Sequence, residues 1–359
     1  MMHTSITHPI GDFVRSISPF PELAFGVNLL LSIIAICAVA IGTAPILIYM
    51  ERKVCAAIQC RLGPMRLGYR GTLQTIADVL KLLFKEVYAP AGADKFIFYL
   101  APMLSLTAPF LALTMIPFDY NLQVVNLSIG IPFIIAVNAF GILGMLIGGW
   151  ASNNKYSLLG SLRSGAQMIS YEISFALILV FIVMVSGSAS LMEITQSQSG
   201  GLFQWWIFKI PGLGFIAFIL FFISSTAELN RAPFDIAEAE QELTGGYHTE
   251  YNGTAFAMFY LAEYINIVLA SSIGVTCFLG GYLPPLLGIE SVDSLLIKIP
   301  GFIWFAAKVL FMIWAYMVVR WTFVRPRVDQ LMAFEWKFLL PLNLLVLILG
   351  ALYISFIGF

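Results

Sequence analysis

The segment from residue 228 to 250 contains six acidic side chains and a single basic one. If residues 233–244 form a helix, Asp235, Glu238 and Glu242 share one face of it at positions i, i+3 and i+7. Like charges at this spacing repel one another, and protonation of one member relieves the repulsion. We therefore expect raised and coupled pKa values, which suit a segment that holds and passes protons. The charged residues of the segment are Glu228, Arg231, Asp235, Glu238, Glu240, Glu242 and Glu250.

Three further ionisable residues lie inside apolar stretches of the chain: Glu172, Glu263 and Lys308. A charged side chain costs about 2.5–3.5 kcal/mol at the centre of a bilayer on insertion scales. Together with Glu228, these residues favour a buried polar path through a helical bundle. Static ion pairs that lock helices together are the structural alternative, and an acidic solvated loop is the alternative for the 228–250 segment.

The composition indicates whether most of the chain lies in water or in a membrane. Apolar residues make up 60% of the 359 residues and charged residues only 11%, where soluble chains carry about 25% charge. We therefore predict an all-α polytopic membrane protein, because a spanning helix needs about 20 mostly apolar residues. Eight stretches qualify within a single membrane domain, of which the fifth is the shortest: about 23–50, 96–117, 129–151, 168–188, 212–228, 255–280, 301–321 and 338–358.

The distribution of lysine and arginine predicts the orientation. The four loops 51–95, 152–167, 229–254 and 322–337, with their flanks, hold fifteen of the nineteen basic residues. The opposite side holds Arg15, Lys209 and Lys298. Because basic loops stay in the cytoplasm, these four loops are predicted to be cytoplasmic and both termini periplasmic.

The first of these loops is patterned rather than merely basic. From Met50 to Leu62, apolar residues recur at helical spacing among charged ones, which predicts a short amphipathic helix in the membrane interface that ends at Gly63. A second amphipathic pattern runs from Leu73 to Val87. The alternative is a basic loop that only fixes topology and binds anionic lipid headgroups.

The chain is not expected to bind a metal or a nucleotide. It has three histidines and no C-x-x-C motif, an inventory that cannot build an iron–sulfur centre, a haem pair or a typical zinc site. The glycines Gly212 and Gly214 open an apolar stretch, without the strand and third glycine of a dinucleotide site. Redox cofactors must therefore be supplied by partner proteins.

Four blocks of sequence resemble the NuoH family, the H subunits of respiratory complex I in bacteria and their mitochondrial counterparts. The first is E-R-K at 51–53 with Q-C-R-L-G-P at 59–64 and A-D-V-L-K-L-L-F-K-E at 77–86. The second is S-N-N-K-Y-S at 152–157 with S-Y-E at 170–172. The third is A-E-L-N-R-A-P-F-D at 227–235, followed by E-A-E at 238–240, G-Y-H-T-E-Y at 246–251 and A-E-Y at 262–264. The fourth is R-P-R-V-D-Q-L-M at 325–332.

The resemblance implies eight transmembrane helices at the junction of the membrane and peripheral arms of a proton-pumping NADH:quinone oxidoreductase. It also implies that ubiquinone or menaquinone is the substrate, bound in a chamber shared with partner subunits. Residues at the chamber or its entrance would be Glu51, Arg52, Arg61, Asp78, Arg231 and Asp235. Residues of the proton-coupling path would be Glu172, Glu228, Asp235, Glu238, Glu240, Glu242 and Glu263. Lys308 is assigned to the same path because it lies inside a predicted span.

The chain departs from the family pattern at four positions. Met65 and Tyr69 stand where the first loop often has Asn and Pro, which puts the local turn geometry in doubt. Ala237 replaces a usual proline of the acidic loop, and Val328 replaces a common aromatic residue. None of the four removes a titratable group from the expected path.

The sequence thus predicts a membrane subunit that forms part of the quinone chamber and the start of the proton-coupling path, and that is not catalytic alone. Its expected partners are other membrane subunits, the peripheral iron–sulfur and quinone-site subunits, and membrane lipids, but no nucleic acid. The expected location is the bacterial inner membrane, with the mitochondrial inner membrane as the alternative. Other functions left open are the related subunits of membrane-bound hydrogenases and of ferredoxin-driven photosynthetic complexes, a structural anchor for the peripheral arm, and a cation/proton antiporter.

Overall fold

The computed structural model describes residues 21–236 and 244–357, and these form helices and connecting segments without a named strand. Seven helices are long and apolar enough to cross a membrane, and Leu213–Glu228 is a shorter apolar helix. The prediction of an all-α polytopic membrane protein is therefore confirmed. The helices are α2 (Pro21–Ile58), α3 (Gln74–Phe84), α4 (Lys95–Leu113), α5 (Gly130–Ala151), α6 (Lys155–Ser186), α7 (Leu191–Gln196), α8 (Trp206–Lys209), α9 (Leu213–Glu228), α11 (Gly253–Phe278), α12 (Glu290–Leu296), α13 (Gly301–Thr322), α14 (Val328–Phe334) and α15 (Leu340–Ile357).

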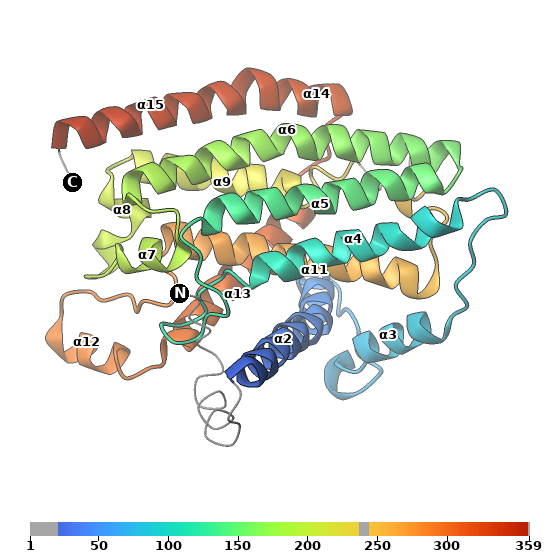
Figure 1. Ribbon diagram of the computed structural model, residues 1–359, viewed down its shortest axis with the longest axis horizontal. Coiled ribbons are helices and arrows are strands. Elements are labelled where there is room, and N and C mark those ends of the chain that lie inside the picture. The colour runs from blue at the N-terminus through green and yellow to red at the C-terminus, as the bar shows by residue number, and fades with distance from the viewer. Residues whose placement is uncertain (1–20, 237–243, 358–359) are drawn as a thin grey trace.

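The long helices lie in stacked layers, with α14 and α15 along one edge, α6 and α9 beneath them, and α4, α5 and α11 further in (Figure 1). Helix α2 crosses the bundle at a steep angle (Figure 1). The short helices α7, α8 and α12 lie at one end of the bundle, whereas α3 and the α5–α6 turn lie at the other (Figure 1). The loops that carry most of the basic residues are thus separated from those that carry few.

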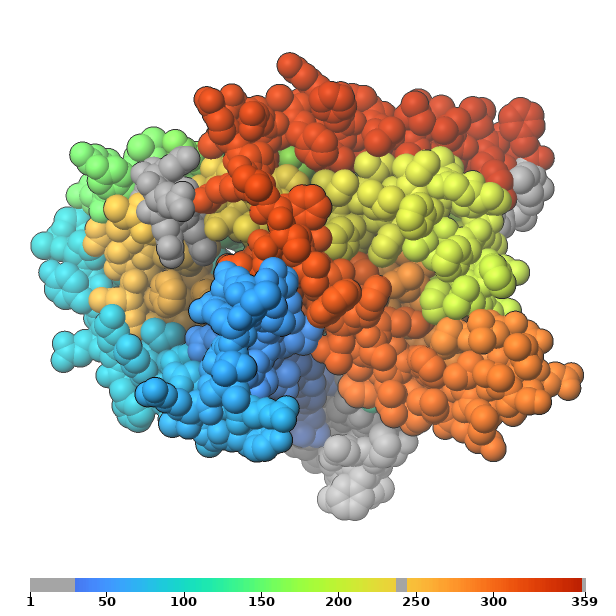
Figure 2. All heavy atoms as spheres, turned by 180° about the vertical axis from the view of Figure 1, so that it is seen from behind, coloured from blue at the N-terminus to red at the C-terminus, as the bar shows by residue number. Residues whose placement is uncertain are grey.

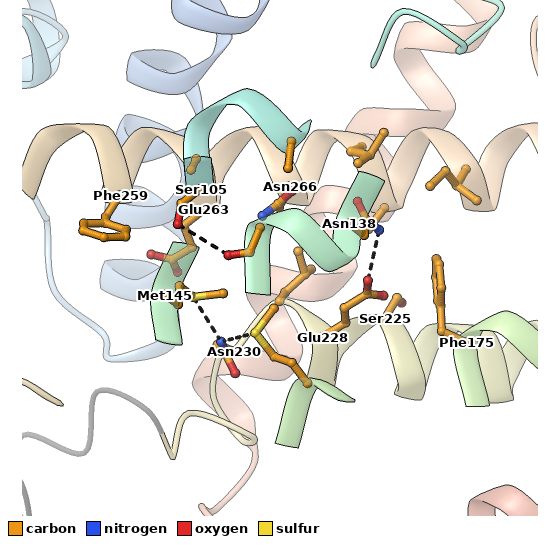
Figure 3. Close-up of a pocket in the computed structure, with 18 of the residues that line it drawn as sticks. Ser105, Asn138, Met145, Phe175, Ser225, Glu228, Asn230, Phe259, Glu263 and Asn266 are labelled. Atoms are coloured by element: carbon orange, nitrogen blue, oxygen red, sulfur yellow. Dashed lines mark hydrogen bonds between the residues drawn. The ribbon is translucent and has the colours of Figure 1, made fainter. Parts of the chain in front are cut away.

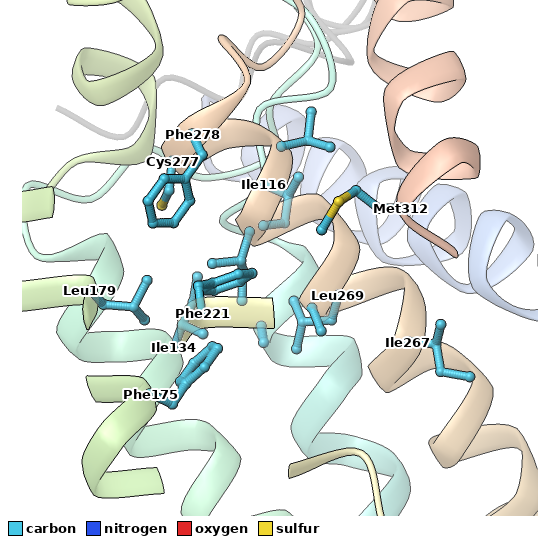
Figure 4. Packing of buried hydrophobic residues seen from close by; sticks show 14 of the residues in the cluster. Ile116, Ile134, Phe175, Leu179, Phe221, Ile267, Leu269, Cys277, Phe278 and Met312 are labelled. Atoms are coloured by element: carbon cyan, nitrogen blue, oxygen red, sulfur yellow. The ribbon is translucent and has the colours of Figure 1, made fainter. Parts of the chain in front are cut away.

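The buried core is apolar and aromatic, with Phe175, Phe221 and Phe278 packed against one another at ring-centroid distances of 5.3 and 5.4 Å (Figure 4). Small residues bring the backbones of α4 and α5 together. A side chain at Gly144 would collide with the hydroxyl and the backbone nitrogen of Ser105, so only glycine permits this approach. Close contact through small residues is the usual way in which membrane helices associate.

The helix boundaries differ from the predicted spans in three places. Residues 50–58, predicted as part of a separate interfacial helix, instead continue α2, while the second amphipathic segment does form a helix of its own, α3. Helix α6 begins at Lys155 rather than near 168, where the Asn154 side chain accepts a hydrogen bond from the Tyr156 N–H. Hydropathy misses the first half of α6 because its buried face there consists of serine, glycine and glutamine.

The last predicted span also begins earlier than residue 338. Helix α14 starts at Val328, and a five-residue π-helical segment, η4 (Glu335–Leu339), joins it to α15. The helix considered for residues 233–244 does not begin at 233, because residues 233–236 are not helical and the Phe234 carbonyl accepts a hydrogen bond from Gln167 Nε2. Residues 237–243, with Glu238, Glu240 and Glu242, lie outside the described part of the chain.

Candidate functional site

A buried network of charges connects three distant segments of the chain. Arg231, in the turn after α9, donates from Nη1 to Glu51 Oε2 at 2.6 Å and from Nε to Glu263 Oε1 at 2.5 Å. The Arg231 and Glu51 side chains are each 7% exposed. Arg320 of α13 forms a second ion pair with Glu51, to which the Tyr264 hydroxyl also donates at 2.6 Å. One arginine therefore shares its charge between two buried carboxylates that come from α2 and α11.

The charge state of Arg231 follows from this geometry. Burial alone lowers the pKa of its guanidinium, but the carboxylates of Glu263 and Glu51 more than compensate and raise the pKa well above its ordinary value. Arg231 is therefore a permanent cation. Removal of one partner of a buried ion pair typically costs about 3–5 kcal/mol, because an uncompensated charge remains.

A cavity of about 460 Å³ opens beside this network. That volume falls within the roughly 300–1,000 Å³ range of small-molecule sites. In Figure 2 the segment after α2 (blue) lies close to the segment at the end of α13 (red-orange), and the cavity lies between these two segments. Its wall combines donors with aromatic rings: Ile48, Glu51, Arg52, Cys55, Arg61, Gly63, Pro64, Tyr260, Tyr264, Arg320 and Trp321.

Three of the predicted entrance residues line this cavity: Glu51, Arg52 and Arg61. Asp78 of α3 holds Arg52 through a half-exposed ion pair of 2.7 Å. Lys53 donates to the Pro64 carbonyl at 2.7 Å, and this contact ties the turn after α2 back onto the helix. The amphipathic first loop therefore forms one side of the cavity instead of lying apart from it.

A second, internal cavity of about 50 Å³ contains both Glu228 and Glu263 in its wall. Asn138 of α5 points toward Glu228 and donates to its Oε1 at 3.0 Å (Figure 3). Asn230 and Asn266 also line the cavity, the latter one turn after Glu263 on α11. A polar cavity of this size has room for water between the two carboxylates.

Glu172 belongs to the same group, because it lies close enough to Glu228 for their carboxylates to interact electrostatically. Asp235 lies apart from the internal cavity, at the surface, where Arg325 approaches it at 3.6 Å. The structure thus places Glu172 near Glu228, and Glu228 and Glu263 in the wall of one cavity, and Arg231 joins Glu263 to Glu51. The spacing of the acids in the sequence does not reveal this arrangement.

Lys308, predicted as part of the coupling path, lies elsewhere. Its ammonium donates to the carbonyls of Leu279, Gly281 and Leu283 at 2.7, 3.0 and 2.7 Å, just beyond the end of α11. It also sits 4.1 Å from the ring centroid of Trp205. All three ammonium donors are therefore used on backbone acceptors, an arrangement that fixes a chain reversal.

The Lys308→Met variant tests this structural role. Loss of three charge-assisted hydrogen bonds should destabilise the subunit by roughly 2–4 kcal/mol. The assembled complex should then unfold at a lower temperature in a thermal melt, with its proton-to-electron ratio unchanged. Lys298→Met, at an exposed position, is the matched control. An unchanged melting temperature combined with lost pumping would return Lys308 to the coupling path.

Arg320, Tyr264 and Asn138 are site residues to which the sequence alone assigns no role. In the sequence, Arg320 is only one of the basic residues near a loop, whereas in the structure it pairs with Glu51 in the cavity wall. The sequence feature that could have identified Arg320 is its position at the end of an apolar span, one residue before Trp321. Asn138 is a lone amide inside an apolar stretch, which sequence reasoning about charged residues passes over.

Comparisons with known proteins give the family of the chain. Residues 30–351 match the family model described as NADH dehydrogenase. The chain is 46% identical over 328 residues to the H subunit of the NADH-quinone oxidoreductase of Bacteroides thetaiotaomicron, an alignment that covers 90% of each chain. It is 44% identical over 354 residues to the H subunit of the same enzyme from Phocaeicola vulgatus, with 98% of this chain and 97% of the relative covered. The chain therefore belongs to the NADH dehydrogenase family, together with these H subunits.

Proposed function

We propose that the chain is the membrane subunit of a proton-translocating NADH-quinone oxidoreductase that binds the quinone head and starts the proton-coupling path. The observation that carries the proposal is the position of Arg231. This arginine pairs with Glu51, in the wall of the 460 Å³ cavity, and with Glu263, in the wall of the internal cavity. One side chain therefore joins a site that could hold a substrate to a site that could hold protons.

The larger cavity suits a quinone on chemical grounds. The guanidinium groups of Arg52, Arg61 and Arg320 can donate hydrogen bonds to quinone oxygens, and Trp321 and Tyr260 provide aromatic surface for the ring. A guanidinium is a strong donor to oxygen that carries developing negative charge. The names of the relatives include a quinone, and this favours the quinone enzyme over the hydrogenase and ferredoxin-driven alternatives.

Coupling follows from competition for shared cations. Reduction of a quinone in the cavity adds negative charge or draws protons beside Arg320 and Glu51. The strength of the ion pairs that Glu51 forms with Arg231 and Arg320 then changes. As a result, the Arg231 guanidinium pairs more strongly with one of Glu51 and Glu263 and less strongly with the other. Glu263 in turn influences Glu228 across the internal cavity, because charges in a low-dielectric interior are weakly screened. No electron enters this path, and only protons and charges shift along it.

The proposal extends to topology and partners. Both termini are assigned to the periplasmic side of a bacterial inner membrane, so that the quinone cavity and the acidic segment face the cytoplasm. The electrons would come from iron–sulfur and quinone-site subunits of the peripheral arm, docked against the same face. Glu238, Glu240 and Glu242 would belong to the chamber end of the path.

Photolabelling of the assembled complex with a photoreactive quinone tests the site. We expect cross-links in the peptides that contain residues 48–64, 260–264 and 320–321, and we expect excess unmodified quinone to suppress them. The α12 segment at the other end of the bundle is the internal control. Labelling confined to α12, or labelling that excess quinone does not reduce, would contradict both the site and the orientation.

A further inference from the structure

A second row of buried polar side chains runs between α6 and the last helix, apart from the candidate site. Gln167, Tyr171 and Ser174 occupy positions i, i+4 and i+7 of α6, and they are 1%, 0% and 0% exposed. Glu335 of η4, which bonds Ser174, is 0% exposed, and Asn343 of α15, eight residues later in the chain, is 2% exposed. We call these five residues the polar seam.

Hydrogen bonds connect four members of the polar seam to neighbouring segments. Gln167 Nε2 donates to the carbonyls of Ala227 and Phe234 at 2.8 and 2.7 Å, in the region of the turn that holds Asp235. The Tyr171 hydroxyl donates to the Leu331 carbonyl at 3.1 Å. Ser174 Oγ donates to Glu335 Oε1. The seam thus begins near the Asp235–Arg325 surface pair and passes into the bundle.

Several atoms of the polar seam have no hydrogen-bond partner within the described residues. These are Gln167 Oε1, Glu335 Oε2, and both amide atoms of Asn343. A buried polar atom without a protein partner is costly, and internal water usually satisfies it. Unpaired atoms recur along the row from Gln167 to Asn343, which is the arrangement expected of a hydrated path rather than of a dry apolar interface.

The charges around Glu335 favour its neutral form. Over the described residues, no ion pair reaches it. The titratable group that faces it from α6 is Tyr171. Asp329 on α14 is exposed and paired with Arg327, Lys337 on η4 is exposed, and Tyr353 lies near the far end of α15. Glu228, the last residue of α9, follows Ala227, whose carbonyl accepts a hydrogen bond from Gln167 of the seam. Burial without a neighbouring cation favours the protonated form of a carboxyl, because ionisation in a low-dielectric interior is expensive.

The backbone at Glu335 is also unusual. Glu335 is the first residue of η4, the π-helical turn between α14 and α15. Such single π turns are frequent at functional sites. Glu172 lies only two residues before Ser174 on α6, so the two side chains point to different sides of that helix. Glu335 is not among the residues that line the internal cavity with Glu228 and Glu263.

We propose that the polar seam is a second proton-conducting route into the membrane part of the protein, in which Glu335 holds the proton. A proton that leaves the Glu335 carboxyl toward Asn343 is replaced by one that arrives from the Asp235 end past Gln167. An O–H bond breaks and an equivalent one forms, so no electron or co-reactant takes part. The inference does not depend on where the quinone binds.

Infrared spectroscopy of the resting assembled complex tests the proposal. The wild-type spectrum should contain the carbonyl stretch of a protonated carboxylic acid that shifts in D₂O, and Glu335→Gln should lose it. Glu290→Gln, at an exposed position of α12, is the matched control and should retain it. Identical wild-type and Glu335→Gln spectra would overturn the proposal, because Glu335 would then hold no exchangeable proton.

Two further variants keep the test decisive if Glu335→Gln fails to assemble. Ser174→Ala keeps the carboxyl but removes its donor, so the same band should move to higher frequency. Asn343→Leu should slow proton exchange at Glu335 on transfer to D₂O. An unmoved band in Ser174→Ala and an unaltered exchange rate in Asn343→Leu would refute the route, whereas the pumping defect expected of Glu263→Gln would be unaffected.

Discussion

Replacement of Glu263 by glutamine should lower coupled quinone reduction by about tenfold or more, which corresponds to roughly 1.4 kcal/mol or more in the barrier. Glutamine keeps the size and one acceptor oxygen of the side chain but cannot bind and release a proton. It also leaves Arg231 with a single carboxylate partner, Glu51. The measurement is proton uptake into vesicles that contain the assembled complex, recorded together with NADH oxidation.

Glu193→Gln is the matched control for this variant. Glu193 is an exposed glutamate on α7, at the other end of the bundle from α3, so its replacement should change neither rate nor stoichiometry. If Glu263→Gln kept both the wild-type proton-to-electron ratio and the wild-type turnover, Glu263 would have no role in coupling. A structural anchor predicts a different pattern, in which assembly is lost but any complex that assembles remains fully active.

Replacement of Arg231 by methionine should have the largest effect on the stability of the site. Glu51 and Glu263 would both lose a buried cation, at a cost of about 3–5 kcal/mol. We expect little assembled complex in membranes, together with loss of quinone reductase activity in the part that assembles. The measurement is the amount of intact complex after detergent extraction, with activity normalised to that amount.

Two companion variants separate charge from geometry at Arg231. Arg231→Lys restores the charge, but an ammonium cannot hold two carboxylates in the fixed fork of a guanidinium, so recovery should be partial. The double variant Glu263→Gln/Arg231→Met also removes the carboxylate that loses its ion pair with Arg231, whereas Glu51 keeps Arg320, so it should assemble better than Arg231→Met alone. Strictly additive losses would show that Arg231 and Glu263 act independently, against the bridging role.

The contrast between Glu263 and Lys308 shows where reasoning about single residues reaches its limit. Both are ionisable residues in apolar stretches, and insertion cost alone assigns both to a proton path. In the structure, Glu263 shares Arg231 with Glu51, whereas Lys308 binds three carbonyls beyond the end of α11. The sequence indicates that a buried charge needs a compensating partner, but the packing of the helices determines which residue that partner is.

Glu335 illustrates the converse error. Counting from hydropathy alone places it in a loop before the last span, where a glutamate needs no explanation. In the structure it is fully buried against Ser174 on α6, because the helical part of the last span begins at α14 and continues through a π turn. A hydropathy window averages over the short polar interruption and therefore misplaces the start of the helix.

The sequence by itself determined the properties that depend on composition and local pattern: an all-α membrane protein, the amphipathic α3, and the residue types of the expected site. These depend on transfer free energies and helical periodicity, which neighbouring residues in the chain define. Only the tertiary structure decided that Arg231 joins Glu51 to Glu263, since these residues come from the end of α2, the turn after α9 and the middle of α11. Pairing across such separations depends on how the helices cross, and no local pattern encodes that crossing.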